Sequence, residues 1–124
     1  MEKIKIFIVD DNLAARNMLK HMIETQGDME IVGEGGSGKA SVPMIEQTAP
    51  DVVLLEVEAG GGLAIEEVMA QIKRVNPAIH VIFCAAPNDD GLIAPLMGSG
   101  AEDFIRKPYN NVSLLRTIRH VVNK

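Results

Sequence analysis

The chain has 124 residues, of which 47% are hydrophobic and 23% charged, so it is long enough for one domain with a buried core and too short for two. A net charge of -5 argues against nucleic acid or an anionic membrane as the main partner, because both require a basic surface. The single cysteine, Cys84, excludes an internal disulfide, and neither a signal peptide nor a membrane-spanning run appears. We therefore expect one cytoplasmic domain over residues 1–124.

Strand and helix patterns alternate five times along the chain. Runs of apolar and β-branched residues predict strands at 4–9, 29–33, 51–58, 79–86 and 101–105. Helical spacing of apolar residues predicts helices at 13–25, 37–48, 63–75, 88–98 and 111–122. Pro43 and Pro95 should disturb the second and fourth helices, because proline lacks a backbone donor. Crossovers of this length imply a parallel sheet with helices on both faces, an α/β sandwich of three layers.

The third strand is the one around which the chain is organised. Residues 52–55 are aliphatic with no polar alternation, which is typical of a central strand buried on both faces. The carboxyl ends of parallel strands meet at one edge of the sheet, where open α/β folds place their sites. That edge should bring together residues from four strand ends, namely Asp10, Asp11, Glu56, Ala85 and Lys107.

Three segments carry a resemblance to a known family: Val9-Asp10-Asp11, the run 50–56 that ends on Glu56, and the run 100–108 that contains Lys107-Pro108. In order and spacing they resemble the receiver domain of two-component response regulators, of the type found in chemotaxis regulators. The resemblance implies a flavodoxin-like fold of five βα units with strand order 2-1-3-4-5. It also implies a signalling module, not an enzyme, that takes a phosphoryl group from a histidine kinase onto an aspartate with Mg²⁺ bound.

The resemblance also implies roles by position. The candidate site residues are the phosphoacceptor position Glu56, the acidic pocket residues Asp10 and Asp11, the phosphate-clamp lysine Lys107, and the switch positions Ala85 and Phe104. A Mg²⁺ ion would be held by Asp11, Glu56 and Glu58, the last in the position where the family uses a backbone carbonyl.

Three departures from the family pattern bear on function. Glu56 replaces the acceptor aspartate and moves the carboxylate outward by one methylene, which disturbs an in-line transfer. Ala85 replaces a threonine or serine and has no hydroxyl to follow the phosphoryl group. The loop 59–64, with glycines at 60–62, replaces a proline-stiffened loop and should be mobile. These departures favour a pseudo-receiver that acts by protein–protein interaction; the alternative is a functional Mg²⁺-dependent phosphoacceptor.

The acid cluster has two physical interpretations. Three carboxylates at one edge raise one another's pKa unless a cation compensates. That cation is either a weakly bound Mg²⁺ or the Lys107 ammonium in a metal-free ion pair with Glu56. An engineered mimic of the phosphorylated aspartate is a further interpretation of Glu56, which Ala85 and the glycine run disfavour.

A second motif, at residues 33–40, follows a strand and fits G-x-x-x-x-G-K, the pattern of a phosphate-binding loop. Its last position is Ala40, whereas such a loop needs a serine or threonine to hold Mg²⁺. We expect a flexible turn there and no nucleotide site.

The expected partner is a protein. It would bind the face formed by the helix at 88–98, the fifth strand and the last helix, which Pro95 and Tyr109 should shape. A histidine kinase is a further candidate partner, and we expect a monomer or a weak homodimer.

Overall fold

The computed structural model describes residues 2–123, and its five-stranded parallel sheet has the order β2-β1-β3-β4-β5. The predicted fold class and strand order are thus confirmed. The strands are β1 (Ile4–Val9), β2 (Met29–Gly35), β3 (Val52–Glu56), β4 (His80–Ala85) and β5 (Asp103–Arg106). The helices are α1 (Leu13–Glu24), α2 (Gly38–Thr48), α3 (Ile65–Val75), α4 (Asp90–Met97) and α5 (Asn111–Asn123), with the short 3-10 helix η1 (Pro87–Asp89) before α4.

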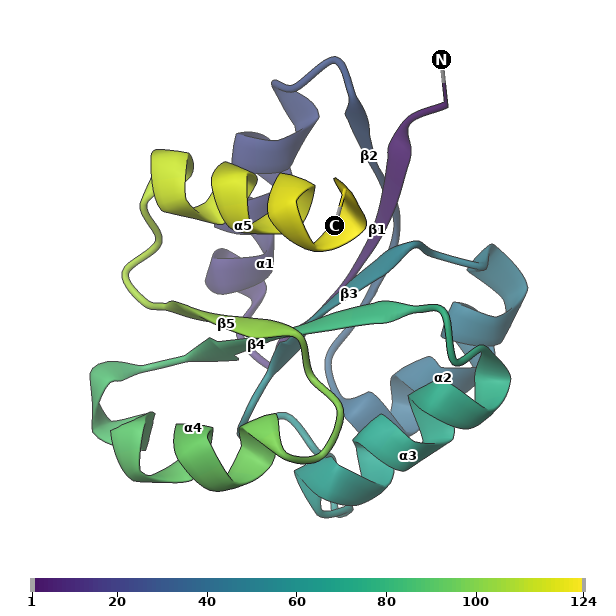
Figure 1. The fold of residues 1–124 in the computed structure, drawn as a ribbon, viewed down its shortest axis with the longest axis vertical. Helices are drawn as coiled ribbons and strands as arrows, with labels where there is room; N and C mark the ends of the chain where they lie inside the picture. The colour runs from purple at the N-terminus through teal and green to yellow at the C-terminus, as the bar shows by residue number, and fades with distance from the viewer. Residues whose placement is uncertain (1, 124) are drawn as a thin grey trace.

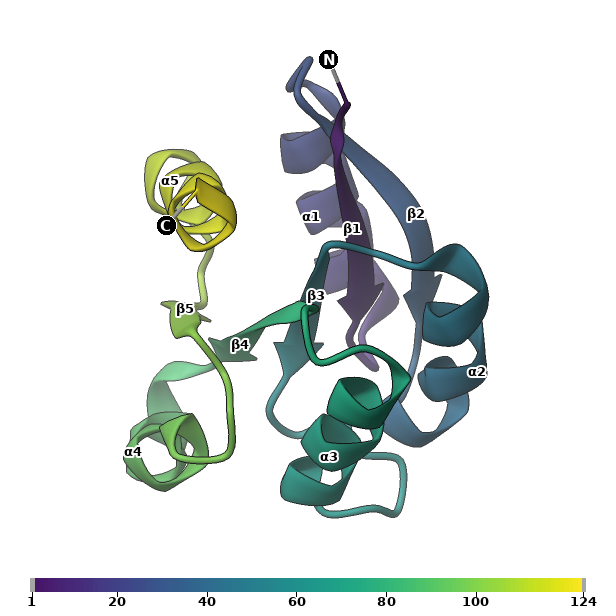
Figure 2. The same cartoon turned by 45° about the vertical axis from the view of Figure 1, so that its right-hand side comes forward.

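The sheet separates two apolar layers, as Figures 1 and 2 show. Helices α1 and α5 cover one face, and α2, α3 and α4 cover the other. Successive residues of a strand point to opposite faces, so Ile6 and Ile8 of β1 pack in the α1/α5 layer, whereas Phe7 and Val9 pack in the opposite layer. The central strand β3 is buried along its whole length, as its apolar run predicts.

Element boundaries differ from the predicted ones in a few places. Strand β3 ends at Glu56 because the chain turns there, with the Ala59 amide donating to the Glu56 carbonyl. Pro43 lies inside α2 without delaying its start, since the Ser37 side chain caps the helix by accepting from the Ala40 amide. No helix within residues 2–123 is both long and apolar enough to cross a membrane.

Candidate functional site

The side chains of the predicted pocket share one face of the sheet. Ile8 of β1 and Leu54 of β3 point into the α1/α5 layer. Asp10 and Glu56 each lie two residues further along the same strand direction, so they point to the same side. Lys107 extends β5 by one hydrogen bond, in which its amide donates to the Ala85 carbonyl at 2.8 Å. A period of two therefore brings Asp10, Glu56 and Lys107 to the same side of the carboxyl edge.

Lys107 pairs with Asp10. Its Nζ lies 3.0 Å from Asp10 Oδ2, and the other carboxylate oxygen of Asp10 accepts from the Asn12 amide at 2.9 Å. Asp10 is only 1% exposed. Partial burial disfavours the charged ammonium, but the Asp10 carboxylate holds the pKa of Lys107 above its usual range.

Of the two interpretations of the acid cluster, the metal-free ion pair between Glu56 and Lys107 is not the one observed, since within residues 2–123 Lys107 pairs with Asp10 and forms no salt bridge with Glu56. The physical reason lies in the hydrogen bonds of the two acids. The Asp10 carboxylate is almost fully buried and already partnered by a backbone amide, so the ammonium completes its shell. The Glu56 side chain instead turns toward its own loop.

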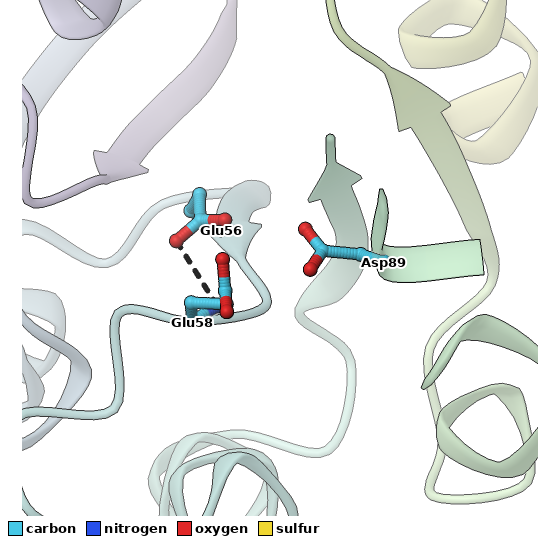
Figure 3. A group of neighbouring side chains, drawn as sticks. All are labelled: Glu56, Glu58 and Asp89. Carbon is cyan, nitrogen blue, oxygen red and sulfur yellow. Dashed lines mark hydrogen bonds between the residues drawn. The ribbon is translucent and has the colours of Figure 1, made fainter. Parts of the chain in front are cut away.

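Glu56 is 4% exposed, and its Oε2 accepts from the Glu58 amide at 3.0 Å (Figure 3). Burial raises the pKa of Glu56 to about 7, because the charged form loses its hydration. The Glu58 amide and the Lys107 charge oppose that rise, whereas the charges of Asp10 and Asp11 add to it. Near neutral pH the carboxyl of Glu56 is thus a mixture of acid and anion.

Glu56, Glu58 and Asp89 form a cluster in which one carboxylate oxygen from each lies within 4.8 Å of the others. Figure 3 shows the three side chains converging from the end of β3 and from η1. Asp89 is 2% exposed, and its Oδ2 accepts from the Ala86 amide at 2.9 Å. Three carboxylates are a suitable donor set for Mg²⁺, which prefers oxygen ligands.

Asp89 is the acidic residue that sequence reasoning missed as a candidate ligand. It lies in η1, just past the carboxyl end of β4. Its place after a strand end was the available signal. Asp11, a predicted ligand, does not belong to the Glu56–Glu58–Asp89 cluster.

The two switch positions lie in the opposite layer. Ala85 is fully buried there, so its methyl group offers the pocket neither a donor nor an acceptor. Phe104 packs partly buried against the same core, and the Arg106 guanidinium carbon lies 5.4 Å from its ring centroid, within cation–π distance. Arg106 also forms an ion pair with Asp90 of α4, which ties this helix to β5.

Behind Glu56 lie two further titratable side chains. Cys84 pairs with Glu56 in the register of β3 and β4, and burial raises the pKa of its thiol to about 12, so it is a packing residue and not a nucleophile. The Tyr109 hydroxyl is buried beside the Cys84 thiol, which is only a weak hydrogen-bonding partner. Within residues 2–123 this hydroxyl has no nitrogen or oxygen partner. Burial is also the main reason that the pKa of Tyr109 is raised.

Tyr109 was expected to shape the α4–β5–α5 face. Instead its ring lines a hollow with Asn12 and Met18 at the start of α1. The groove on the α4–β5–α5 face is lined by other residues, among them Phe104 and Ser113. The expectation for Tyr109 is wrong because its side chain points into the α1/α5 layer.

In the segment that resembles a phosphate-binding loop, two amides at the start of α2 are occupied. The Gly38 amide donates to the Ala59 carbonyl at 2.6 Å, and the Lys39 amide donates to the Gly60 carbonyl at 3.2 Å. A phosphate cradle requires such amides to be free, so the helix start is a docking point for the glycine loop. The mobility of that loop stays a prediction.

Comparison with known proteins agrees with this geometry. The family model described as the response regulator receiver domain matches residues 6–119. The chemotaxis protein CheY of Listeria monocytogenes is 32% identical over 117 residues, which cover 93% of this chain and 95% of CheY. CheY of Thermotoga maritima is 30% identical, covering 94% of this chain and 96% of its own.

Two further comparisons involve methylesterases. A protein-glutamate methylesterase/protein-glutamine glutaminase of Pyrococcus horikoshii is 32% identical over 90% of this chain but only 30% of the enzyme, so the similarity does not extend to the rest of that protein. The solved response regulator domain of Thermotoga maritima CheB superposes with a TM-score of 0.85 at 28% identity, covering 99% of this chain and 98% of that domain.

Family match, sheet order and the convergence of Asp10, Glu56 and Lys107 at one strand edge lead to the same assignment. Receiver domains are signalling modules of two-component systems and are not themselves catalytic domains. The chain belongs to the response regulator receiver family.

Proposed function

We propose that this chain is an atypical receiver that acts through protein–protein contacts without being phosphorylated at Glu56. The observation that carries the proposal is the Glu56 carboxyl, which is buried and hydrogen-bonded to the amide of its own loop at Glu58. A phosphoacceptor must present an ionised oxygen in line with the donor. Glu56 combines an extra methylene, a raised pKa and an engaged oxygen, and all three disfavour transfer.

The relay from the pocket to the surface is also altered. Ala85 places a methyl group where the family has a hydroxyl, and a methyl group cannot make a hydrogen bond. Without that hydroxyl, the route by which the family links its pocket to the α4–β5–α5 face is missing, so we infer a constant output conformation. A groove of about 340 Å³ on this face, lined in part by Phe104, Arg106 and Thr117, supports a protein partner there.

Magnesium fits the acidic pocket. Glu58 and Asp89 would hold the ion together with Glu56, whose carboxyl must first lose its proton. When bound, Mg²⁺ supplies positive charge that neutralises the cluster. The side chain of Glu58 is the accessible member of the cluster, whereas Asp89 is fixed by the Ala86 amide. We infer weak binding, because one ligand must be deprotonated and another must be ordered.

The second candidate function is a working phosphoacceptor that receives its phosphate from a histidine kinase. It is favoured by the retained acid and lysine positions Asp10, Asp11 and Lys107, since Lys107 could release Asp10 and clamp a phosphoryl group. This function requires Mg²⁺ bound through Asp11. A Mg²⁺ titration followed by thermal unfolding separates the two, because only a working pocket loses its Mg²⁺ response in Asp11→Ala.

The proposal is tested by recording ¹H–¹⁵N spectra of the protein with Mg²⁺, before and after acetyl phosphate is added. We expect no change at Ala85, at Phe104 or along α4 beyond the effect of Mg²⁺ alone. The Glu56→Asp variant restores the family's acceptor and is the matched control. A shift of the α4–β5–α5 resonances in the unmodified chain would overturn the proposal.

A further inference from the structure

The outer face of α5 has an apolar and basic stripe that the receiver pocket does not use. The stripe lines a shallow groove of about 620 Å³ and consists of Val112, Leu115, Arg116, Arg119 and His120. Their spacing places them on one side of the helix. Val112 is 68% exposed, the highest fraction among the exposed large hydrophobic side chains of residues 2–123.

This stripe differs from the α4–β5–α5 face. The α5 residues that line the groove on that face are Ser113 and Thr117. Each of them directly follows a residue of the stripe, so it points to a different side of the helix. The inner side of α5, represented by Leu114 and Ile118, is buried in the core. The helix therefore has three distinct sides, and the stripe is an outward side on which Val112 is exposed.

The charge of the stripe is opposite to that of the chain. The chain has a net charge of -5, yet the groove is lined by two arginines and a histidine and by no acid. Arg119 is held by Asp28, with Nε to Oδ2 and a terminal nitrogen to Oδ1 both at 2.9 Å. Arg116 is exposed and makes no hydrogen bond or ion pair with any residue of 2–123, so its guanidinium is available.

We propose that the α5 stripe docks an acidic amphipathic helix of a partner protein. Apolar side chains of that helix would cover Val112 and Leu115, and one of its carboxylates would reach Arg116, since the Arg119 fork already pairs with Asp28. An amphipathic helix lying along a groove presents anchors at this same spacing, and an arginine fork matches a carboxylate. The inference does not depend on what happens at Glu56.

A second copy of the chain is a poorer occupant. A two-fold contact places the same surface on both copies, so Arg116 would face the arginines of its own stripe. Like charges brought together at an interface oppose association. The exposed Arg116 guanidinium on this side thus favours an acidic partner of different sequence.

The probes are two fluorescein-labelled synthetic helices, one of Leu and Glu and one in which every Glu is replaced by Lys. Anisotropy measures their affinity for the whole chain, and ¹H–¹⁵N spectra locate the contact. The variant is Arg116→Glu, and Lys39→Glu is its control, since Lys39 is an exposed residue at the start of α2 in the opposite layer. Both substitutions are on the surface, and circular dichroism checks that each variant folds.

We expect the Leu/Glu helix to bind and to shift the resonances of Val112, Leu115 and Arg116. Arg116→Glu should weaken it about tenfold, whereas Lys39→Glu should change it by less than about twofold, because a charge-assisted contact contributes ~1.5 kcal/mol or more. Equal affinity for the two probes, equal effects of the two variants, or shifts confined to the α4–β5–α5 groove would overturn the proposal. So would sedimentation showing a dimer that Arg116→Glu dissociates, since the occupant would then be a second copy.

Discussion

Replacing Glu56 by glutamine should make the protein less sensitive to pH. Glutamine keeps the shape of the side chain and its ability to accept from the Glu58 amide, but it cannot ionise. In the unmodified chain, burial raises the pKa of Glu56 from 4.5 to about 7. Ionising this side chain therefore destabilises the folded state relative to the unfolded chain, where the carboxyl is hydrated.

The sign and size of the effect follow from proton linkage. Because the folded pKa is the higher one, the folded state binds the proton more tightly, and this contribution to stability is lost as the pH rises through about 7. At ~1.36 kcal/mol per pKa unit the full effect is about 3 kcal/mol. Of this, about 2.5 kcal/mol falls between roughly pH 5 and pH 8.

Urea denaturation of the Glu56→Gln variant and the unmodified chain at several pH values measures this contribution. We expect the stability of the variant relative to the unmodified chain to increase by about 2.5 kcal/mol from roughly pH 5 to pH 8. Glu46→Gln removes the same charge from the exposed side of α2 and serves as the control. A difference between Glu56→Gln and the parent that stays flat across this range would refute the inference that Glu56 is desolvated.

Three further changes test the surroundings of the pocket. Lys107→Met leaves the Asp10 carboxylate, which is 1% exposed, without its ammonium partner. Because Lys107 is itself partly exposed, we expect the free energy of unfolding in urea to fall by about 2 kcal/mol. An unchanged free energy of unfolding would contradict the pairing. Gly61→Ala would place a Cβ 2.5 Å from Ser37 Cβ at a φ of +71°, so it should destabilise the fold by about 2 kcal/mol. Gly62→Ala should destabilise the fold less, because its Cβ would meet open space. Asp89→Asn should weaken Mg²⁺ binding about tenfold in a thermal-shift titration, and unchanged affinity would exclude Asp89 as a ligand.

Strand alternation made most of the fold and the pocket predictable. The buried run of β3 and the strand-ending acids placed Asp10, Glu56 and Lys107 at one edge, because a period of two and a parallel topology leave little choice. These are properties of the backbone, and they are read from spacing alone.

The partner choices inside the pocket were not predictable in the same way. Lys107 reaches Asp10 and not Glu56, since the Glu56 side chain is long enough to turn back to the Glu58 amide. Asp89 enters the pocket only because η1 returns the chain to the strand edge after β4. Such outcomes depend on rotamers and on loop paths, which the spacing of residue types does not determine.

We propose that the receiver fold of this chain surrounds a carboxyl that does not accept a phosphoryl group. Intact-mass measurement after incubation with Mg²⁺ and acetyl phosphate, on the unmodified chain and on Glu56→Asp side by side, tests it most directly. We predict no adduct on the unmodified chain. A stoichiometric, acid-stable phosphoryl adduct that maps to Glu56 would contradict the claim.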